Sequence, residues 1–99
     1  MFSLGLDIGS SSVKAALTET LTGKKIAFVQ EPKDEMEMIS VHASWAEQDP
    51  NHWWKIVCIA IKKLLQNSRV DASQIQRIGI AYQMHGLVVV DESGDCLRN

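Results

Sequence analysis

The sequence predicts an α/β domain with a mixed β-sheet and elements in the order β-β-β-α-β-β. Apolar and polar residues alternate over three short segments near the N-terminus, which is the period of half-buried strands. A longer segment that follows has apolar residues at helical spacing, and two short apolar runs come after it. Because a helix separates the third strand from the fourth, the fourth strand can lie parallel to the first and beside it.

The first three strands are expected at residues 2–8, 12–18 and 25–31, where short turns make them an antiparallel meander. In a strand, side chains alternate between the two faces of the sheet. The larger apolar residues of the first two strands therefore share one face, and Asp7 and Lys14 share the other.

A helix is expected at residues 51–67, where apolar residues recur at helical spacing over several turns. Asp49 can accept hydrogen bonds from the free N–H groups of the first turn, and Pro50 suits the first helical position. Trp53 and Trp54 belong to the apolar set, so we expect both to pack in the core, and a sugar-stacking platform is the alternative.

The segments on either side of the helix have less regular patterns. Residues 32–48 are expected to be irregular, and residues 70–74 to form a short capped turn. A strand is expected at residues 77–83, where small residues oppose large ones, a pattern typical of a central strand covered on both faces. The last strand is expected at residues 87–91, with a turn at 92–95.

The composition is that of an ordinary globular domain, with 99 residues, 45% hydrophobic and 22% charged. A net charge of -2 with interspersed acids and bases argues against nucleic acid or an anionic membrane as a partner. Neither a basic leader nor an apolar run near the ~20 residues of a membrane span is present, so we expect a cytoplasmic protein. Cys58 and Cys96 lack paired spacing, and no structural zinc is expected.

The first candidate site is the turn after the first strand, where an acid is followed at once by glycine and serine. Consecutive backbone N–H groups at Gly9, Ser10 and Ser11 can form a concavity that binds phosphate oxygens. Asp7 is placed to meet a hydrated cation that carries this phosphate, and Lys14 can reach the same anion. Neither a Walker loop nor a GxGxxG fingerprint is present, and local sequence leaves a plain hairpin turn as an alternative.

The second candidate site is the segment Gln83, Met84, His85 and Gly86, which ends the strand after the helix. An amide and an imidazole both donate and accept hydrogen bonds, which suits sugar hydroxyls, and a methionine offers an apolar wall for carbon-bound hydrogens. A structural histidine is the alternative. If the first and fourth strands are parallel neighbours, both turns meet at the same edge of the sheet and line one cleft.

Three segments, at residues 5–14, 45–54 and 78–91, resemble in the same order the N-terminal part of the FGGY family of carbohydrate kinases. Within that family, the segment at residues 83–86 is most similar to the xylulokinases. The resemblance implies a ribonuclease-H-like lobe of the actin and hexokinase type. It also implies phosphorylation of D-xylulose to D-xylulose 5-phosphate, with ATP and Mg²⁺ as cofactors.

The resemblance implies a role for each candidate residue. Asp7 corresponds to the acid that organises Mg²⁺ and phosphate, and Met84 with His85 corresponds to a sugar-binding pair beside Gln83. The segment that contacts the phosphates of ATP corresponds to Gly9, Ser10, Ser11, Ser12 and Lys14.

Family members are several times longer than this chain, and their general base and adenosine site lie far beyond residue 99. We therefore expect residues 1–99 to be a truncated N-terminal part of the first kinase lobe, inactive by itself, within a parent enzyme. A truncated lobe exposes apolar surface and strand edges, so a homodimer or strand exchange is expected. The alternatives are a non-catalytic actin-like or sugar-sensing relative, or a kinase for ribulose, gluconate or glycerol.

Overall fold

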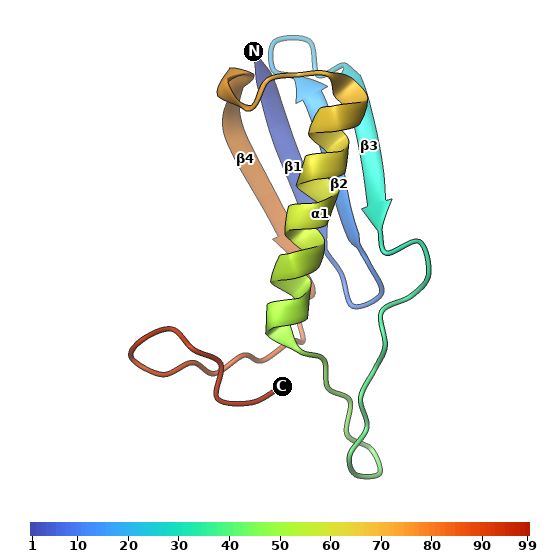
Figure 1. The fold of residues 1–99 in the computed structure, drawn as a ribbon, viewed down its shortest axis with the longest axis vertical. Helices are drawn as coiled ribbons and strands as arrows, with labels where there is room; N and C mark the ends of the chain where they lie inside the picture. The colour runs from blue at the N-terminus through green and yellow to red at the C-terminus, as the bar shows by residue number, and fades with distance from the viewer.

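The computed structural model describes residues 1–99 as a four-stranded mixed sheet with one long helix across one face (Figure 1). The strands lie in the order β3-β2-β1-β4, with β1, β2 and β3 antiparallel and β4 parallel to β1. The predicted α/β mixed sheet is therefore confirmed. The bounds of the elements are β1 Phe2–Ile8, β2 Val13–Glu19, β3 Lys25–Glu31, α1 Pro50–Ser68, the short 3-10 helix η1 Ala72–Gln74, and β4 Ile75–Tyr82.

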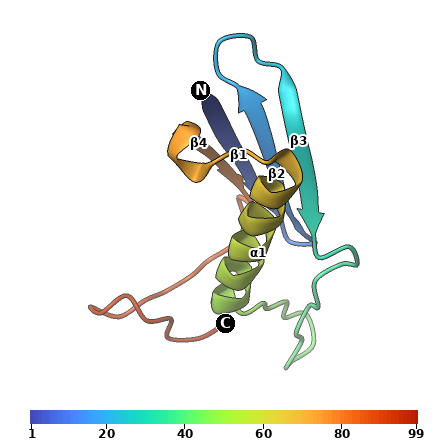
Figure 2. The same ribbon diagram turned by 45° about the horizontal axis from the view of Figure 1, so that its top comes forward.

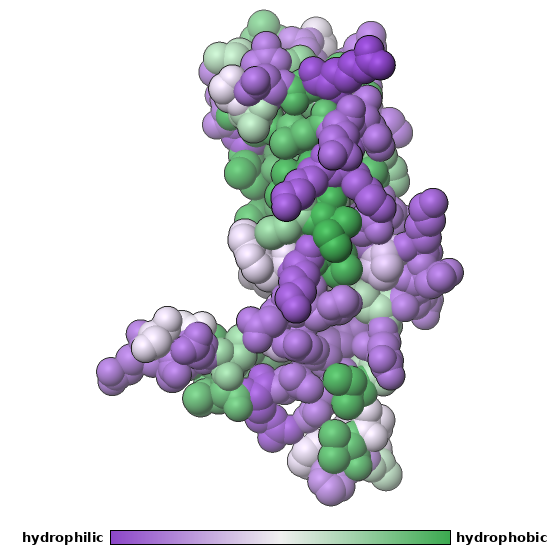
Figure 3. Space-filling view, viewed as in Figure 1, coloured by the Kyte–Doolittle hydropathy of each residue, from purple (hydrophilic) through white to green (hydrophobic).

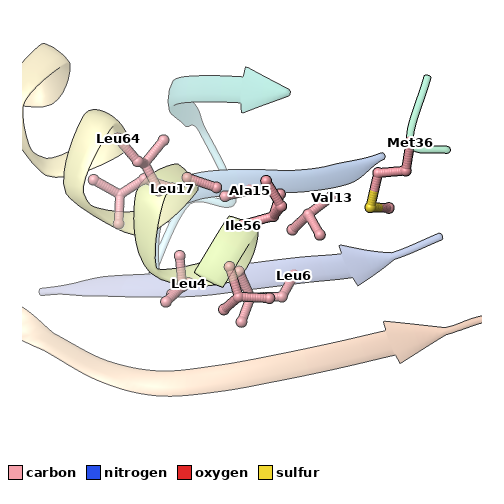
Figure 4. Packing of buried hydrophobic residues seen from close by; sticks show 10 residues of the cluster. Leu4, Leu6, Val13, Ala15, Leu17, Met36, Ile56 and Leu64 are labelled. Carbon is pink, nitrogen blue, oxygen red and sulfur yellow. The ribbon is translucent and has the colours of Figure 1, made fainter. Parts of the chain in front are cut away.

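The core lies between α1 and the sheet. Strand alternation sends every second residue of β1 and β2 toward the helix, as predicted, and one stripe of α1 packs against them (Figure 4). Met36, from the segment after β3, closes the end of this core beside the β1–β2 turn. The ten buried core residues are Leu4, Leu6, Val13, Ala15, Leu17, Met36, Ile56, Val57, Ala60 and Leu64.

Helix α1 starts as predicted but buries less of its apolar surface than its apolar residues predict. The Asp49 carboxylate accepts a hydrogen bond from the Asn51 N–H at 2.9 Å, and Pro50 takes the first turn. Trp53 is partly buried, whereas Trp54 is 67% exposed, so the prediction of a core position for Trp54 is wrong. Neighbours in a helix are about 100° apart, and only one flank of α1 faces the sheet.

Strand β4 lies at the edge of the sheet, so the prediction of a central strand covered on both faces is wrong. Ile78, Ile80 and Tyr82 are exposed although their cross-strand partners in β1 face the helix. The reason is that α1 packs mainly over β2 and β3, which leaves an apolar strip on β4 beside the helix (Figure 3). The alternation along β4 predicts which of its side chains another layer could bury. Helix α1 does not cover those side chains, so they stay exposed.

The predicted strand at residues 87–91 is absent, and the element order is β-β-β-α-β. Only an isolated bridge joins Val90 to Cys96, around the turn that Asp91 closes. A strand needs a neighbour to pair with, and this segment leads away from the sheet instead of along the edge of β4 (Figure 2).

Two extended segments give the molecule its elongated shape. Residues 32–49 are irregular, as predicted, apart from the bridge between Ile39 and Glu47, and residues 83–99 project to the other side (Figure 2). The radius of gyration of 15.3 Å exceeds the value of about 13 Å for a compact domain of this size. Neither helix has the length and apolar character needed to cross a bilayer.

Candidate functional site

The β1–β2 turn is tight and leaves several donors free. The Gly9 N–H donates to the Ser12 carbonyl at 3.0 Å, and a Cβ at Gly9 would lie 3.1 Å from that carbonyl oxygen. Ser10 and Ser11 are exposed. The N–H groups of Ser10, Ser11 and Ser12 donate no hydrogen bond within the protein. Those of Ser10 and Ser11 are open to an anion, and that of Ser12, a residue only 7% exposed, is a donor that still lacks an acceptor.

Asp7 and Lys14 face each other across β1 and β2 as directly opposed residues. Both lie on the sheet face away from α1 and are exposed, and neither belongs to the two ion pairs of the structure. The carboxylate and the ammonium group are therefore free to bind a ligand. They line an open cavity of about 500 Å³ whose other lining residues include Gly5, Ala16, Phe28, Gly79 and Ala81.

The end of β4 lies directly beside the β1–β2 turn. The Gln83 N–H donates to the Ile8 carbonyl at 3.1 Å, which extends the parallel pairing of β1 and β4 by one step. The structure thus brings the two predicted turns together through their backbones, as the parallel arrangement predicts. The Nε2 atom of Gln83 is buried and has no hydrogen-bond partner.

A second cavity of about 560 Å³ lies at the N-terminal end of α1, which is the lower end of the helix in Figure 1, and is called here the cavity below α1. Gln83, His85 and Gly86 line it on one side, and Trp45 and Trp53 line it on another. Its mixture of aromatic surface with an amide and an imidazole is suited to a small polyol, because such ligands need both apolar contact and convergent hydrogen bonds.

The side chains of the two turns do not share one cavity within these residues. Asp7 and Lys14 open to the sheet-face cavity, whereas Gln83 and His85 open to the cavity below α1. Met84 is 82% exposed and lines neither cavity. The two turns are therefore neighbours through their backbones, but the predicted single cleft between them is not present in residues 1–99.

Sequence reasoning missed Gln48 as a site residue. Its side chain is almost buried, and its Nε2 donates to the Ser10 carbonyl at 2.6 Å while its Oε1 accepts from the Trp53 indole N–H at 3.0 Å. Gln48 also lines the cavity below α1. The available signal was a polar residue directly before the helix cap Asp49, which by itself does not predict burial.

Sequence reasoning also missed Trp45 and Arg98 as site residues, and both line the same cavity. The Arg98 guanidinium lies 5.3 Å from the centre of the Trp45 ring and pairs with the Glu47 carboxylate. These contacts tie the end of the chain to the segment before α1, and all three residues line the cavity. No signal in the sequence links positions so far apart.

Asp7 and the first turn fit a Mg²⁺ ion that is bound partly by the phosphates of a substrate. They do not fit a cation that is held by protein ligands alone. No group of three or more histidine, cysteine, aspartate or glutamate side chains comes together to hold a metal. Mg²⁺ commonly binds through one or two carboxylates and the phosphates of its substrate. Asp7, beside the free N–H groups of the turn, has the required chemistry.

Comparison with known sequences assigns the whole chain to one family. Residues 2–99 match the FGGY family of carbohydrate kinases, N-terminal domain. The chain is 36% identical over 95 residues to a protein named xylulose kinase in Staphylococcus epidermidis, and 35% identical over 96 residues to one in Bacillus subtilis. These matches cover 96% and 97% of this chain. The chain spans 18% of the length of either relative.

Comparison with solved structures agrees. The crystal structure described as a xyloylose kinase from Brucella ovis matches with a TM-score of 0.87 and 34% identity, over 99% of this chain and 20% of that one. A gluconate kinase from Lactobacillus acidophilus matches with a TM-score of 0.82 and 28% identity, over 99% of this chain and 18% of that one. The chain therefore has the fold of the N-terminal part of these kinases.

Proposed function

Because the chain belongs to the FGGY family of carbohydrate kinases, we propose that the protein containing it transfers a phosphoryl group from ATP to D-xylulose, forming D-xylulose 5-phosphate. In this proposal, residues 1–99 are the N-terminal part of the first lobe and are inactive alone. The general base and the adenosine site lie in other parts of the protein, which we place in the cytoplasm.

The observation that carries this proposal is the junction of the two turns at the Gln83 to Ile8 hydrogen bond. It puts a turn with free backbone donors next to a cavity suited to a polyol. Phosphoryl transfer depends mainly on positioning the acceptor and on stabilising phosphoryl charge, so this neighbourhood is what such a reaction needs.

Each residue of the first turn has a defined task in this proposal. The N–H groups of Ser10, Ser11 and Ser12 bind phosphate oxygens, and Gly9 permits the close turn that presents them. Lys14 adds positive charge, and Asp7 binds the Mg²⁺ of MgATP. That ion supplies neutralisation of the charge on the phosphates.

The second turn contributes the sugar side of the site. Gln83 and His85 hydrogen-bond the hydroxyls of the sugar, and the buried Nε2 of Gln83 is a donor that still needs an acceptor. Met84 is exposed, so we propose that it contacts the sugar from outside the cavity below α1.

The apolar strip on β4, formed by Ile78, Ile80 and Tyr82, is exposed. We propose that the 99-residue chain by itself pairs with a second copy through this surface.

A second candidate is a kinase for another ketose or a sugar acid. Two relatives favour it, one named L-xylulose/3-keto-L-gulonate kinase, which is 34% identical, and the gluconate kinase described above. A non-catalytic actin-like or sugar-sensing protein is the third possibility.

The test measures ADP release by the full-length protein with MgATP and a panel of D-xylulose, L-xylulose, D-ribulose, gluconate and glycerol. The highest kcat/KM is expected for D-xylulose. A higher value for another acceptor would favour the second candidate, and no turnover with any acceptor would favour the non-catalytic one.

An Asp7→Ala variant checks the metal assignment in the same assay. It is expected to lower kcat by about a hundredfold, the scale of losing one electrostatic contact to the transition state. Asp71→Ala is the matched control, because Asp71 caps η1 at the opposite end of β4 from the turn. Normal turnover by the Asp7→Ala variant would show that the metal assignment is wrong.

A further inference from the structure

Gln48 joins three separate parts of the chain at the phosphate-binding turn. Its Nε2 donates to the Ser10 carbonyl at 2.6 Å and to the Glu37 carbonyl at 3.5 Å. Its Oε1 accepts from the indole N–H of Trp53, on α1, at 3.0 Å. Gln48 is 9% exposed, so water competes little for these bonds.

The Trp53 indole determines which way the amide of Gln48 faces. An indole N–H can only donate, so the atom of Gln48 that meets it must be the carbonyl oxygen. The NH₂ group is then left to face the turn, where the Ser10 carbonyl accepts from it. The hydrogen-bond pattern therefore has one consistent orientation for the amide.

The Ser11 carbonyl is held in the same way by the backbone. The Met36 N–H donates to it at 2.8 Å, and Met36 belongs to the core on the α1 side of the sheet. Two consecutive carbonyls of the turn, at Ser10 and Ser11, are thus bound by Gln48 and by Met36.

Binding these carbonyls also sets the direction of the next two N–H groups. Both peptide bonds are trans, since the single cis bond of the chain precedes Pro32. In a planar trans peptide, the N–H points opposite to the C=O of the same unit. The N–H groups of Ser11 and Ser12 therefore point away from Gln48 and Met36, and neither has a partner in the protein.

We propose that Gln48 is a positioning residue for the phosphates of the nucleotide. By holding the Ser10 carbonyl, it aims the Ser11 N–H so that this donor and the Ser12 N–H converge on one phosphate oxygen. Donors that are oriented before the ligand arrives need no reorganisation when charge develops on it. This role rests on the proposed function, because it requires the turn to bind phosphate.

The test uses the full-length protein and MgATP binding by calorimetry, without any sugar. Gln48→Met keeps the volume and removes both hydrogen-bonding ends. It is expected to weaken MgATP binding by about tenfold, the scale of one well-placed hydrogen bond. Gln66→Met is the matched control, because Gln66 is exposed on α1, and this variant is expected to bind like the wild type.

Two further variants separate positioning from general stability. Trp53→Phe removes the indole donor but leaves the bond from Gln48 to Ser10, so a smaller loss of MgATP affinity is expected. Gln48→Asn keeps a polar side chain that is too short to span Trp53 and Ser10, and it replaces Gln48→Met if that variant does not fold. In both Gln48 variants, KM for MgATP is expected to rise by a larger factor than KM for the sugar, because Gln48 contacts the turn directly and is only one of the residues that line the cavity below α1.

The outcomes distinguish this inference from the proposed function. A wild-type protein that binds no MgATP would overturn the proposed function itself. If the wild-type protein binds MgATP and a folded Gln48 variant binds it with the same affinity, the positioning role alone would be overturned. Equal weakening for MgATP and for the sugar, in proportion to lost thermal stability, would make Gln48 a structural residue and would also overturn it.

Discussion

Replacing Gly9 with alanine tests how closely the β1–β2 turn must be packed. The new Cβ would lie 3.1 Å from the Ser12 carbonyl oxygen, whereas ordinary van der Waals contact is 3.4–4 Å. The backbone of Gly9 does not have a positive φ, so the contact alone is responsible for the effect. The same oxygen accepts the Gly9 N–H at 3.0 Å, and moving it away by a few tenths of an ångström weakens that bond.

The expected cost in the free energy of unfolding is about 1 kcal/mol, the net value of a typical hydrogen bond. The shift also turns the Ser12 carbonyl and displaces the neighbouring free N–H groups of Ser11 and Ser12. We therefore expect MgATP affinity of the full-length protein to fall by about fivefold to tenfold. Urea denaturation measures the first effect, and calorimetric titration with MgATP measures the second.

Gly23→Ala is the control for this experiment. Gly23 has a φ of 72°, so alanine there costs roughly 1–2 kcal/mol through backbone strain. It lies in the β2–β3 turn, at the opposite end of β2 from Gly9. Both variants should lose stability, and only Gly9→Ala should lose MgATP affinity. Equal MgATP affinity in the two variants would refute the claim that close packing at Gly9 shapes the phosphate site.

Two further predictions concern the sugar side and the core. His85→Ala is expected to raise KM for the sugar by about tenfold through one lost hydrogen bond, with His52→Ala as an exposed control, and steady-state kinetics of the full-length protein measure it. An unchanged KM would remove His85 from the sugar site. Leu17→Ala, at a fully buried position, is expected to cost about 2–5 kcal/mol in urea denaturation, against roughly 0.5 kcal/mol or less for the 91% exposed Leu21→Ala. Similar losses in both would contradict the placement of the core.

The elements that short-range pattern determines were predicted well. Val13, Ala15 and Leu17 are completely buried, as their alternation predicts, and Asp49 caps α1 as its position before Pro50 predicts. These features depend on residues within a few positions of one another, so they can be read from the sequence. The parallel pairing of β4 with β1 followed from the helix between the strands.

The errors in the fold arise where burial depends on what lies beside an element. Trp54 and Ile80 have the apolar character of core residues, yet both are exposed because α1 presents one flank to β2 and β3. Residues 87–91 have the composition of a strand, but they lead away from the free edge of β4 and do not pair with it. Apolar character sets what a residue gains from burial, and the neighbouring elements decide whether burial occurs.

The residues of the candidate site also differ in whether the sequence alone could predict them. The residue types of the two turns, with Asp7 in one and His85 in the other, are evident in the sequence, and the family resemblance that they carry is confirmed by the match over residues 2–99. Gln48 could not be found in this way, because its contacts at Ser10 and Glu37 come from distant parts of the chain.

The sequence alone determined the four observed strands and α1, the residue types of each turn and the family, because each depends on local spacing or on motifs in order. Only the tertiary structure decided that the turns meet through Gln83 and Ile8 while their side chains open to two cavities. The reason is that adjacent strands share an edge of the sheet, whereas alternation can direct Asp7 to one face and the β4 turn toward the other.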